Sequence, residues 1–193
     1  MKRSLRFLST FLLAFASVCA INAQTITPPT TGDNICQLNS LDLSTVIYFN
    51  DNGKTAVRAN HNTPGGDIVI KGTTYESGVR THADSKFVVK VNGATKFHAI
   101  IGIDDETGTN GNFDYNVFEK GEDGNTKSLA TGTINASNRT ANIDVDVNGW
   151  KYLYLETPNG SDGNNGSDHV DLANAYIVTA TCNAQATSSK VML

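Results

Sequence analysis

The residues best suited to chemistry in this sequence are acids and amides that gather in two short polar segments. Asp104, Asp105 and Glu106 follow an apolar run, and residues 162–168 (DGNNGSD) combine carboxylates, amides and glycines at close spacing. Several oxygen ligands on a flexible loop are what Ca²⁺ prefers. The alternative is a solvent-exposed, turn-rich loop that binds no ion. The predicted Ca²⁺ ligands are Asp104, Asp105, Asp162 and Asp168.

Residue patterns typical of enzymes are missing from the sequence. There is neither a Gly-x-Ser-x-Gly nucleophile elbow nor a His-Glu-x-x-His zinc pair. The four histidines, His61, His82, His98 and His169, lie too far apart for a local metal cluster. Paired acids can hydrolyse glycosidic bonds, but neighbouring loop acids are more often solvated or bound to a cation. We therefore expect no catalytic activity.

Sugar binding is a better match to the composition. It needs planar amide and carboxylate groups for hydrogen bonds and an aromatic or apolar face for the sugar ring. The polar groups occur in residues 60–62, 78–82, 110–112 and 164–171. The aromatic candidates are Tyr48, Tyr75, Trp150 and Tyr176, of which we expect Trp150 to pack at one end of the domain.

The start of the chain has the features of an export signal. Lys2, Arg3 and Arg6 precede an apolar run over residues 7–20, which is too short to span a bilayer as a helix. We predict a signal peptide over residues 1–23, with lipidation of Cys19 as an alternative, and export to the periplasm, the cell surface or the medium. No later segment is apolar enough to cross a membrane, and the net charge of −4 argues against nucleic-acid partners.

Apolar residues alternate with polar ones through most of the mature chain, which is typical of β-strands with one buried face. The alternation occurs in residues 86–91, 95–103, 113–117, 140–147 and 151–156. Turn signals such as Asn92-Gly93 and Asn148-Gly149 separate these runs, and no helical period is present. The sequence thus predicts an all-β fold, an antiparallel β-sandwich of short strands.

The cysteines and the flanking segments set the limits of the domain. Residues 24–34 are rich in Pro and Thr and predict a flexible linker, and residues 184–193 predict an unpatterned tail. One domain over residues 35–183, monomeric, remains between them. In an oxidising compartment Cys36 and Cys182 would form one disulfide, which places the first and last strands side by side.

Three segments, in order, resemble one known family. They are residues 76–85 (ESGVRTHADS), 97–105 (FHAIIGIDD) and 167–175 (SDHVDLANA). Together they are similar to the NPCBM domain, also classed as carbohydrate-binding module family 51, over residues 44–178. The resemblance implies a galactose-binding-like jelly roll, galactose-type glycans as ligands and a structural Ca²⁺ in many members. The chain departs from the family pattern at Leu172, where the family usually has Trp.

By the resemblance, His82, Asp168 and His169 fall on motif positions of the family. Loops cluster at the ends of a sandwich, so residues 164–169 and His82 are expected at one rim. The predicted carbohydrate-binding residues are His82, Asn164, Asp168 and His169. The competing hypothesis is a surface β-sandwich that has kept the fold and lost sugar binding.

Overall fold

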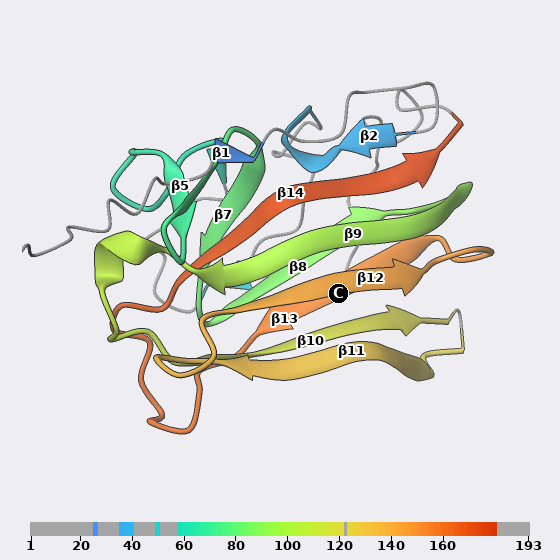
Figure 1. Cartoon of the computed structure of the whole chain (residues 1–193). Coiled ribbons are helices and arrows are strands. Elements are labelled where there is room, and N and C mark those ends of the chain that lie inside the picture. Colours follow the sequence, from blue (N-terminus) through green and yellow to red (C-terminus); the bar gives the residue numbers. More distant parts are fainter. Residues whose placement is uncertain (1–24, 27–34, 41–48, 51–57, 122, 181–193) are drawn as a thin grey trace, which may run out of the picture.

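The structure is a computed structural model that describes residues 25–26, 35–40, 49–50, 58–121 and 123–180. Strands dominate this part of the chain, and its helical segments are two short 3₁₀ turns, η1 (Leu38–Ser40) and η3 (Asp105–Thr107). The strands form two antiparallel sheets packed face to face (Figure 1). The all-β sandwich expected from the alternating pattern is therefore confirmed.

One sheet has five strands in the order β11-β10-β13-β8-β3, and the other has six, β12-β9-β14-β7-β4 with β2 beside β14. A small third sheet, β1-β6-β5, lies on the six-stranded one. The strand bounds are β1 Thr25–Ile26, β2 Ile35–Gln37, β3 Phe49–Asn50, β4 Arg58–Ala59, β5 Ile68–Ile70, β6 Thr73–Tyr75, β7 Gly78–His82, β8 Ser85–Lys90, β9 Ala94–Ile103, β10 Phe113–Lys120, β11 Thr126–Ile134, β12 Thr140–Asp146, β13 Tyr152–Thr157 and β14 His169–Thr179.

The period-two pattern explains which side of each strand faces the core. On β12, Ile143 and Val145 are buried, and they lie opposite Ala99 and Phe97 of β9. Their neighbours Asp144 and Asp146 are exposed, as expected for a sheet with one wet face. The inward residues of both sheets form one main core, which includes Phe97, Ile101, Phe113, Val117, Ile143, Leu153, Leu155, Leu172 and Ile177.

The hairpin of β5 and β6 packs on the outer face of the six-stranded sheet, toward the end where β9 finishes (Figure 1). Ile68, Ile70 and Tyr75 of this hairpin form a second small core with Ala173 of β14. The hairpin approaches closely because Gly102 carries no side chain, since a Cβ there would lie 2.7 Å from Cγ2 of Ile70.

A buried acid closes the core at the end of β10. Glu119 is fully buried, and neither of its carboxylate oxygens has a hydrogen-bond partner. Desolvation raises its pKa to about 7, although Lys127, opposite on β11, partly offsets the rise. Glu119 therefore exchanges its proton near neutral pH.

The ends of the domain meet, as the sequence predicts. β2 and β14 are antiparallel neighbours, with buried Cys36 opposite Ile177. Residues 1–23 and 184–193, together with Cys19, Tyr48 and Cys182, lie outside the described residues, so the signal peptide and the disulfide stay predictions. Within the predicted linker, Thr25–Ile26 forms a strand parallel to β6, where the backbone of the hairpin edge offers it a partner. No helix of the described part of the chain has the length and apolarity needed to cross a membrane.

Candidate functional site

Two histidines meet on the outer face of the six-stranded sheet. His82 is the last residue of β7 and His169 the first of β14, and the two are directly opposite in the strand register. Their ring centroids are 5.0 Å apart, and both side chains are half-buried. Nδ1 of His169 contacts a carboxylate oxygen of Glu106, which follows β9. Three segments far apart in sequence thus supply one exposed group of polar side chains.

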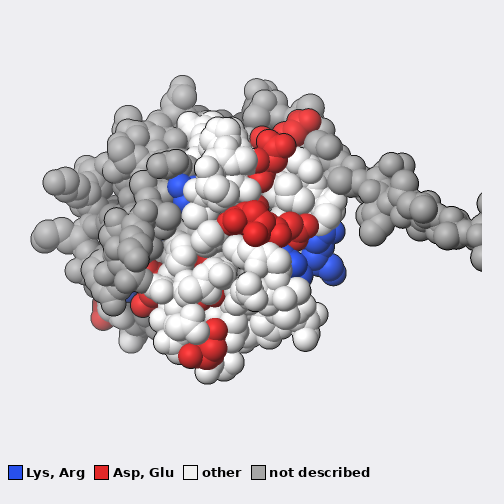
Figure 2. All heavy atoms as spheres, turned by 90° about the vertical axis from the view of Figure 1, so that its left-hand side faces the viewer, with Lys and Arg blue, Asp and Glu red and all other residues white. Residues whose placement is uncertain are grey.

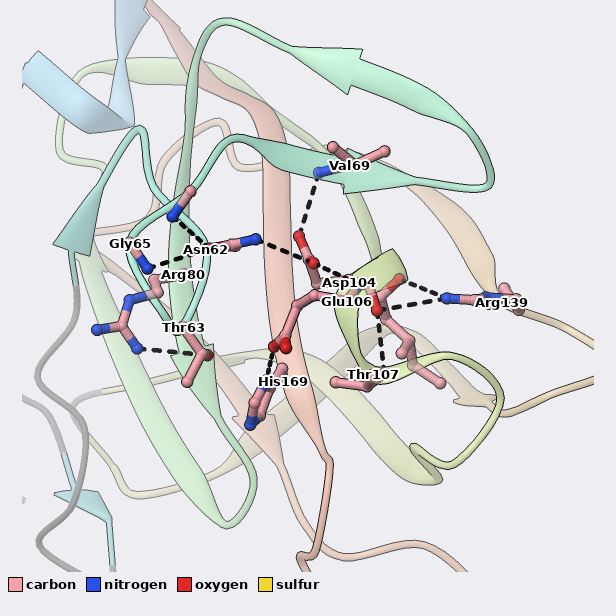
Figure 3. Close-up of polar contacts among 12 residues, drawn as sticks. Asn62, Thr63, Gly65, Val69, Arg80, Asp104, Glu106, Thr107, Arg139 and His169 are labelled. Atoms are coloured by element: carbon pink, nitrogen blue, oxygen red, sulfur yellow. Dashed lines mark hydrogen bonds and ion pairs between the residues drawn. The ribbon is translucent and has the colours of Figure 1, made fainter. Parts of the chain in front are cut away.

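Asp104 is the buried acid that fixes the surroundings of the histidine pair (Figure 3). Its Oδ1 accepts hydrogen bonds from the backbone N–H of Glu106 at 2.9 Å and from Nδ2 of Asn62 at 3.2 Å. Its Oδ2 accepts one from the N–H of Val69 at 3.1 Å. One carboxylate therefore ties η3, the loop before β5 and the hairpin together, and so sets the position of Glu106.

A second buried acid lies beneath the pair. Asp171 is 1% exposed and lies opposite Arg80 of β7, which is 2% exposed. Desolvation, helped by a hydrogen bond with Asp104, raises the pKa of Asp171 well above its usual range. Nη1 of Arg80 donates a hydrogen bond to Oγ1 of Thr63 at 3.3 Å. The Arg80 guanidinium is thus held below the surface, opposite Asp171 and bonded to Thr63.

Asp168 lies behind the pair and is fully buried. Its Oδ1 accepts a hydrogen bond from the N–H of Asn112 at 2.7 Å, and its Oδ2 has no partner. Desolvation raises the pKa of Asp168 to about 6. Asn164 is exposed on the loop between β13 and β14, where its Oδ1 accepts a bond from the N–H of Gly166. Of the four predicted sugar-binding residues, His82 and His169 come together with their side chains partly exposed, whereas Asp168 supports the loops.

The predicted Ca²⁺ ligands divide into two groups with different surroundings. Both oxygens of Asp104 and Asp105 accept hydrogen bonds from N–H donors, and Asp105 also pairs with Nη2 of Arg139 at 2.9 Å. These N–H groups and the Arg139 guanidinium occupy the positions around the carboxylate oxygens that a cation would take. Around Asp168, in contrast, buried oxygens of Asn112 and Asn159 have no hydrogen-bond donor either. The oxygen chemistry there fits Ca²⁺, so an ion near Asp162 and Asp168 stays a prediction.

The described residues contain no group of three or more His, Cys, Asp or Glu side chains placed to hold a metal. The histidine pair with Glu106 is therefore not such a centre in this arrangement. Its remaining chemistry is hydrogen bonding, through imidazole nitrogens and a carboxylate with 30% of its side chain exposed.

The aromatic candidates lie elsewhere. Trp150 packs against the main core, as expected, with Nζ of Lys127 5.8 Å from its ring centre. Tyr75 is buried in the hairpin, and Tyr176 stacks on His98 with centroids 4.8 Å apart. Leu172 is buried in the main core and does not face the histidine pair. Its replacement of the family's usual Trp therefore changes core packing here.

Sequence reasoning missed Glu106, Arg80 and Asp171 as members of this group. The signal for two of them was present, since Arg80 lies two residues before His82 and Asp171 two after His169. Residues two apart on a strand share one face. Glu106 gave no such signal, because its place depends on the bonds that Asp104 makes with Asn62 and Val69.

Solved structures with this fold include CBM51 domains of bacterial proteins. A structure with the CBM51-2 domain of Clostridium perfringens ZmpB superposes with a TM-score of 0.64 at 22% identity, covering 75% of this chain and 31% of that one. A CBM51 of a Clostridium perfringens GH95 protein, in complex with methyl-galactose, gives 0.62 at 21% identity, covering 75% and 99%. Tandem CBM51 modules of a Streptococcus pneumoniae family 98 glycoside hydrolase give 0.60 at 17%, covering 77% and 48%.

These likenesses establish the jelly-roll fold, and the matched part is about a third of the ZmpB chain or less. No curated protein matches the chain in sequence. A family model for the NPCBM/NEW2 domain matches residues 36–178, which include the whole histidine group and nearly all of both main sheets. The chain belongs to the NPCBM/NEW2 domain family.

Proposed function

We propose that this chain is a carbohydrate-binding module for galactose-type glycans and that it binds them at His82, His169 and Glu106. The observation that carries the proposal is the register of β7 and β14, which sets the two imidazoles opposite each other beside a partly exposed carboxylate. Membership of the NPCBM/NEW2 family and the methyl-galactose complex of a CBM51 with this fold support it.

The chemistry of the three side chains suits sugar hydroxyls. A neutral imidazole offers one donor and one acceptor, and a carboxylate accepts from two neighbouring hydroxyls. Each such bond replaces one with water and contributes only about 0.5–1.5 kcal/mol net. A few of them give a Kd of roughly 10 μM to 1 mM. Weak binding to a single sugar is therefore the expected behaviour.

We further propose that the module is not catalytic and acts outside the cell. A glycosidase needs two carboxyl groups that flank the scissile bond. Near the histidine pair, Asp104, Asp168 and Asp171 are buried and Asp105 is paired with Arg139, so Glu106 is the carboxylate that we assign to the ligand. The proposed export rests on the basic and apolar start of the sequence.

A glycan array, followed by calorimetry with the strongest ligand, tests the proposal. His169→Ala and Glu106→Ala should each weaken binding at least tenfold. The matched control is His98→Ala, because His98 lies on the same outer face but stacks on Tyr176. The control should bind like the wild type. Binding of no glycan, or equal losses in all three variants, would overturn the proposed site and favour a sandwich with a structural role.

A further inference from the structure

The exposed charge at the histidine pair is negative. Figure 2 looks onto the end of the molecule that carries η3 and the loop between β13 and β14, where acidic side chains cross the middle and basic side chains lie beside them on the right. Glu106 is exposed there, and among the described residues its ion-pair partner is His169. No lysine or arginine pairs with it in that part of the chain, so its charge is neutralised only when the imidazole is charged.

The two guanidinium groups nearest the histidine pair already have partners within the protein. Arg80 lies beneath the surface, opposite Asp171, and its guanidinium is directed to Thr63. Arg139 is 2.9 Å from a carboxylate oxygen of Asp105. Neither guanidinium is therefore placed to receive a carboxylate or sulfate group of a ligand, although arginine is the residue that usually does so.

We infer that the site selects uncharged glycans and disfavours sugars that carry a carboxylate or a sulfate, with Glu106 as the specificity-determining residue. The inference rests on the proposed function, since it concerns the same site. Two like unit charges about 6 Å apart repel enough to weaken binding roughly three- to tenfold, for a dielectric constant between that of water and half of it. Salt screens such a repulsion, so the penalty should shrink as ionic strength rises.

The test compares three probes of nearly equal shape: galactose, galacturonate and galacturonamide. Calorimetry or ligand-observed NMR at pH 8 and low salt measures each Kd. We expect galacturonate to bind three- to tenfold more weakly than galacturonamide, which has the same size and no charge. In Glu106→Gln the ratio of these two Kd values should approach one, whatever happens to either affinity alone.

The matched control is Glu156→Gln on β13. It removes a carboxylate that pairs with Lys86 of β8 on the five-stranded sheet, away from the histidine pair. It should leave the ratio unchanged. Equal binding of galacturonate and galacturonamide to the wild type would overturn the inference while leaving the proposed function intact. A ratio that persists in Glu106→Gln would do the same, because the discrimination would then come from a charge other than that of Glu106. Binding of none of the three sugars would overturn the proposed function, and the inference with it.

Discussion

Replacing Glu119 by Gln should make the protein more stable at high pH and leave its stability almost unchanged at low pH. Glu119 is fully buried, and desolvation raises its pKa from 4.5 to about 7. The folded protein therefore binds this proton more tightly than the unfolded chain does. The free energy of unfolding must fall as pH rises from about 4.5 to about 7, and must then level off.

The size of the effect follows from the shift. A rise from 4.5 to about 7 corresponds to about 3 kcal/mol at pH 8, at 1.36 kcal/mol per pH unit. The attraction of Lys127 across the ladder is already part of this shift, and just under about 1 kcal/mol of the cost is present at pH 5, so we expect a difference of about 2 kcal/mol between pH 8 and pH 5. Gln has nearly the same shape and cannot ionise, so Glu119→Gln removes the cost above pH 7.

Urea denaturation at pH 5 and pH 8 measures the difference between variant and wild type, in which the other titrating groups cancel. The gain from Glu119→Gln should be about 2 kcal/mol larger at pH 8 than at pH 5. Glu156→Gln is the control, because its ion pair with Lys86 is partly exposed and of a kind worth under about 1 kcal/mol. If Glu119→Gln shifts stability equally at both pH values, Glu119 is not a buried acid that ionises near neutrality.

Three further predictions concern the scaffold. Asp104→Ala leaves the N–H donors of Asn62, Val69 and Glu106 without their acceptor. Because each unsatisfied buried group costs about 1–3 kcal/mol, the variant should lose at least about 3 kcal/mol of unfolding free energy in the same urea assay. A smaller loss would mean that water replaces the carboxylate. Millimolar Ca²⁺ should raise the Tm of the metal-stripped protein, and Asp162→Asn should reduce that rise. Asp105→Asn should not reduce it, because the carboxylate of Asp105 already accepts from N–H donors and pairs with Arg139. Identical Tm values with Ca²⁺ and with chelator would refute the predicted Ca²⁺ site. Mass spectrometry after alkylation of the exported protein should find that Cys36 and Cys182 are not alkylated, because they form a disulfide. Reduction of that disulfide should lower the free energy of unfolding by about 2–5 kcal/mol. Two alkylated thiols would disprove the pairing.

Alternation of apolar and polar residues predicted β9 and β12 well, because each repeats its pattern several times, but it did not predict β11, most of whose residues are exposed. β9 and β12 were expected within a residue of their observed ends. The hairpin of β5 and β6 was not, because its strands have three residues each, too few to show a period. Its place over Ala173 depends on long-range packing that no local pattern reports.

The candidate site was predicted in part for the same reason. His82 and His169 were expected at one rim, and strand pairing brings them together. Residue type could not reveal that Asp168 is buried while Glu106 is exposed, because both are loop acids next to a strand. The difference depends on contacts distant in sequence, since Asp168 accepts a hydrogen bond from the N–H of Asn112 whereas Glu106 contacts His169.

The pairing of β2 with β14 has a mechanical consequence. Ile35 lies opposite Val178, and His169, at the other end of β14, is roughly 30 Å away along the strand (Figure 1). A polypeptide joined after Thr179 would be tethered at the end remote from the histidine pair, which would then point away from the tether. Tension applied at Thr179 would break the pairing of β14 with its neighbours one residue pair at a time from that end. His169, at the far end of β14, would be the last part of the strand to be disrupted by the force, so a ligand bound there would be released last.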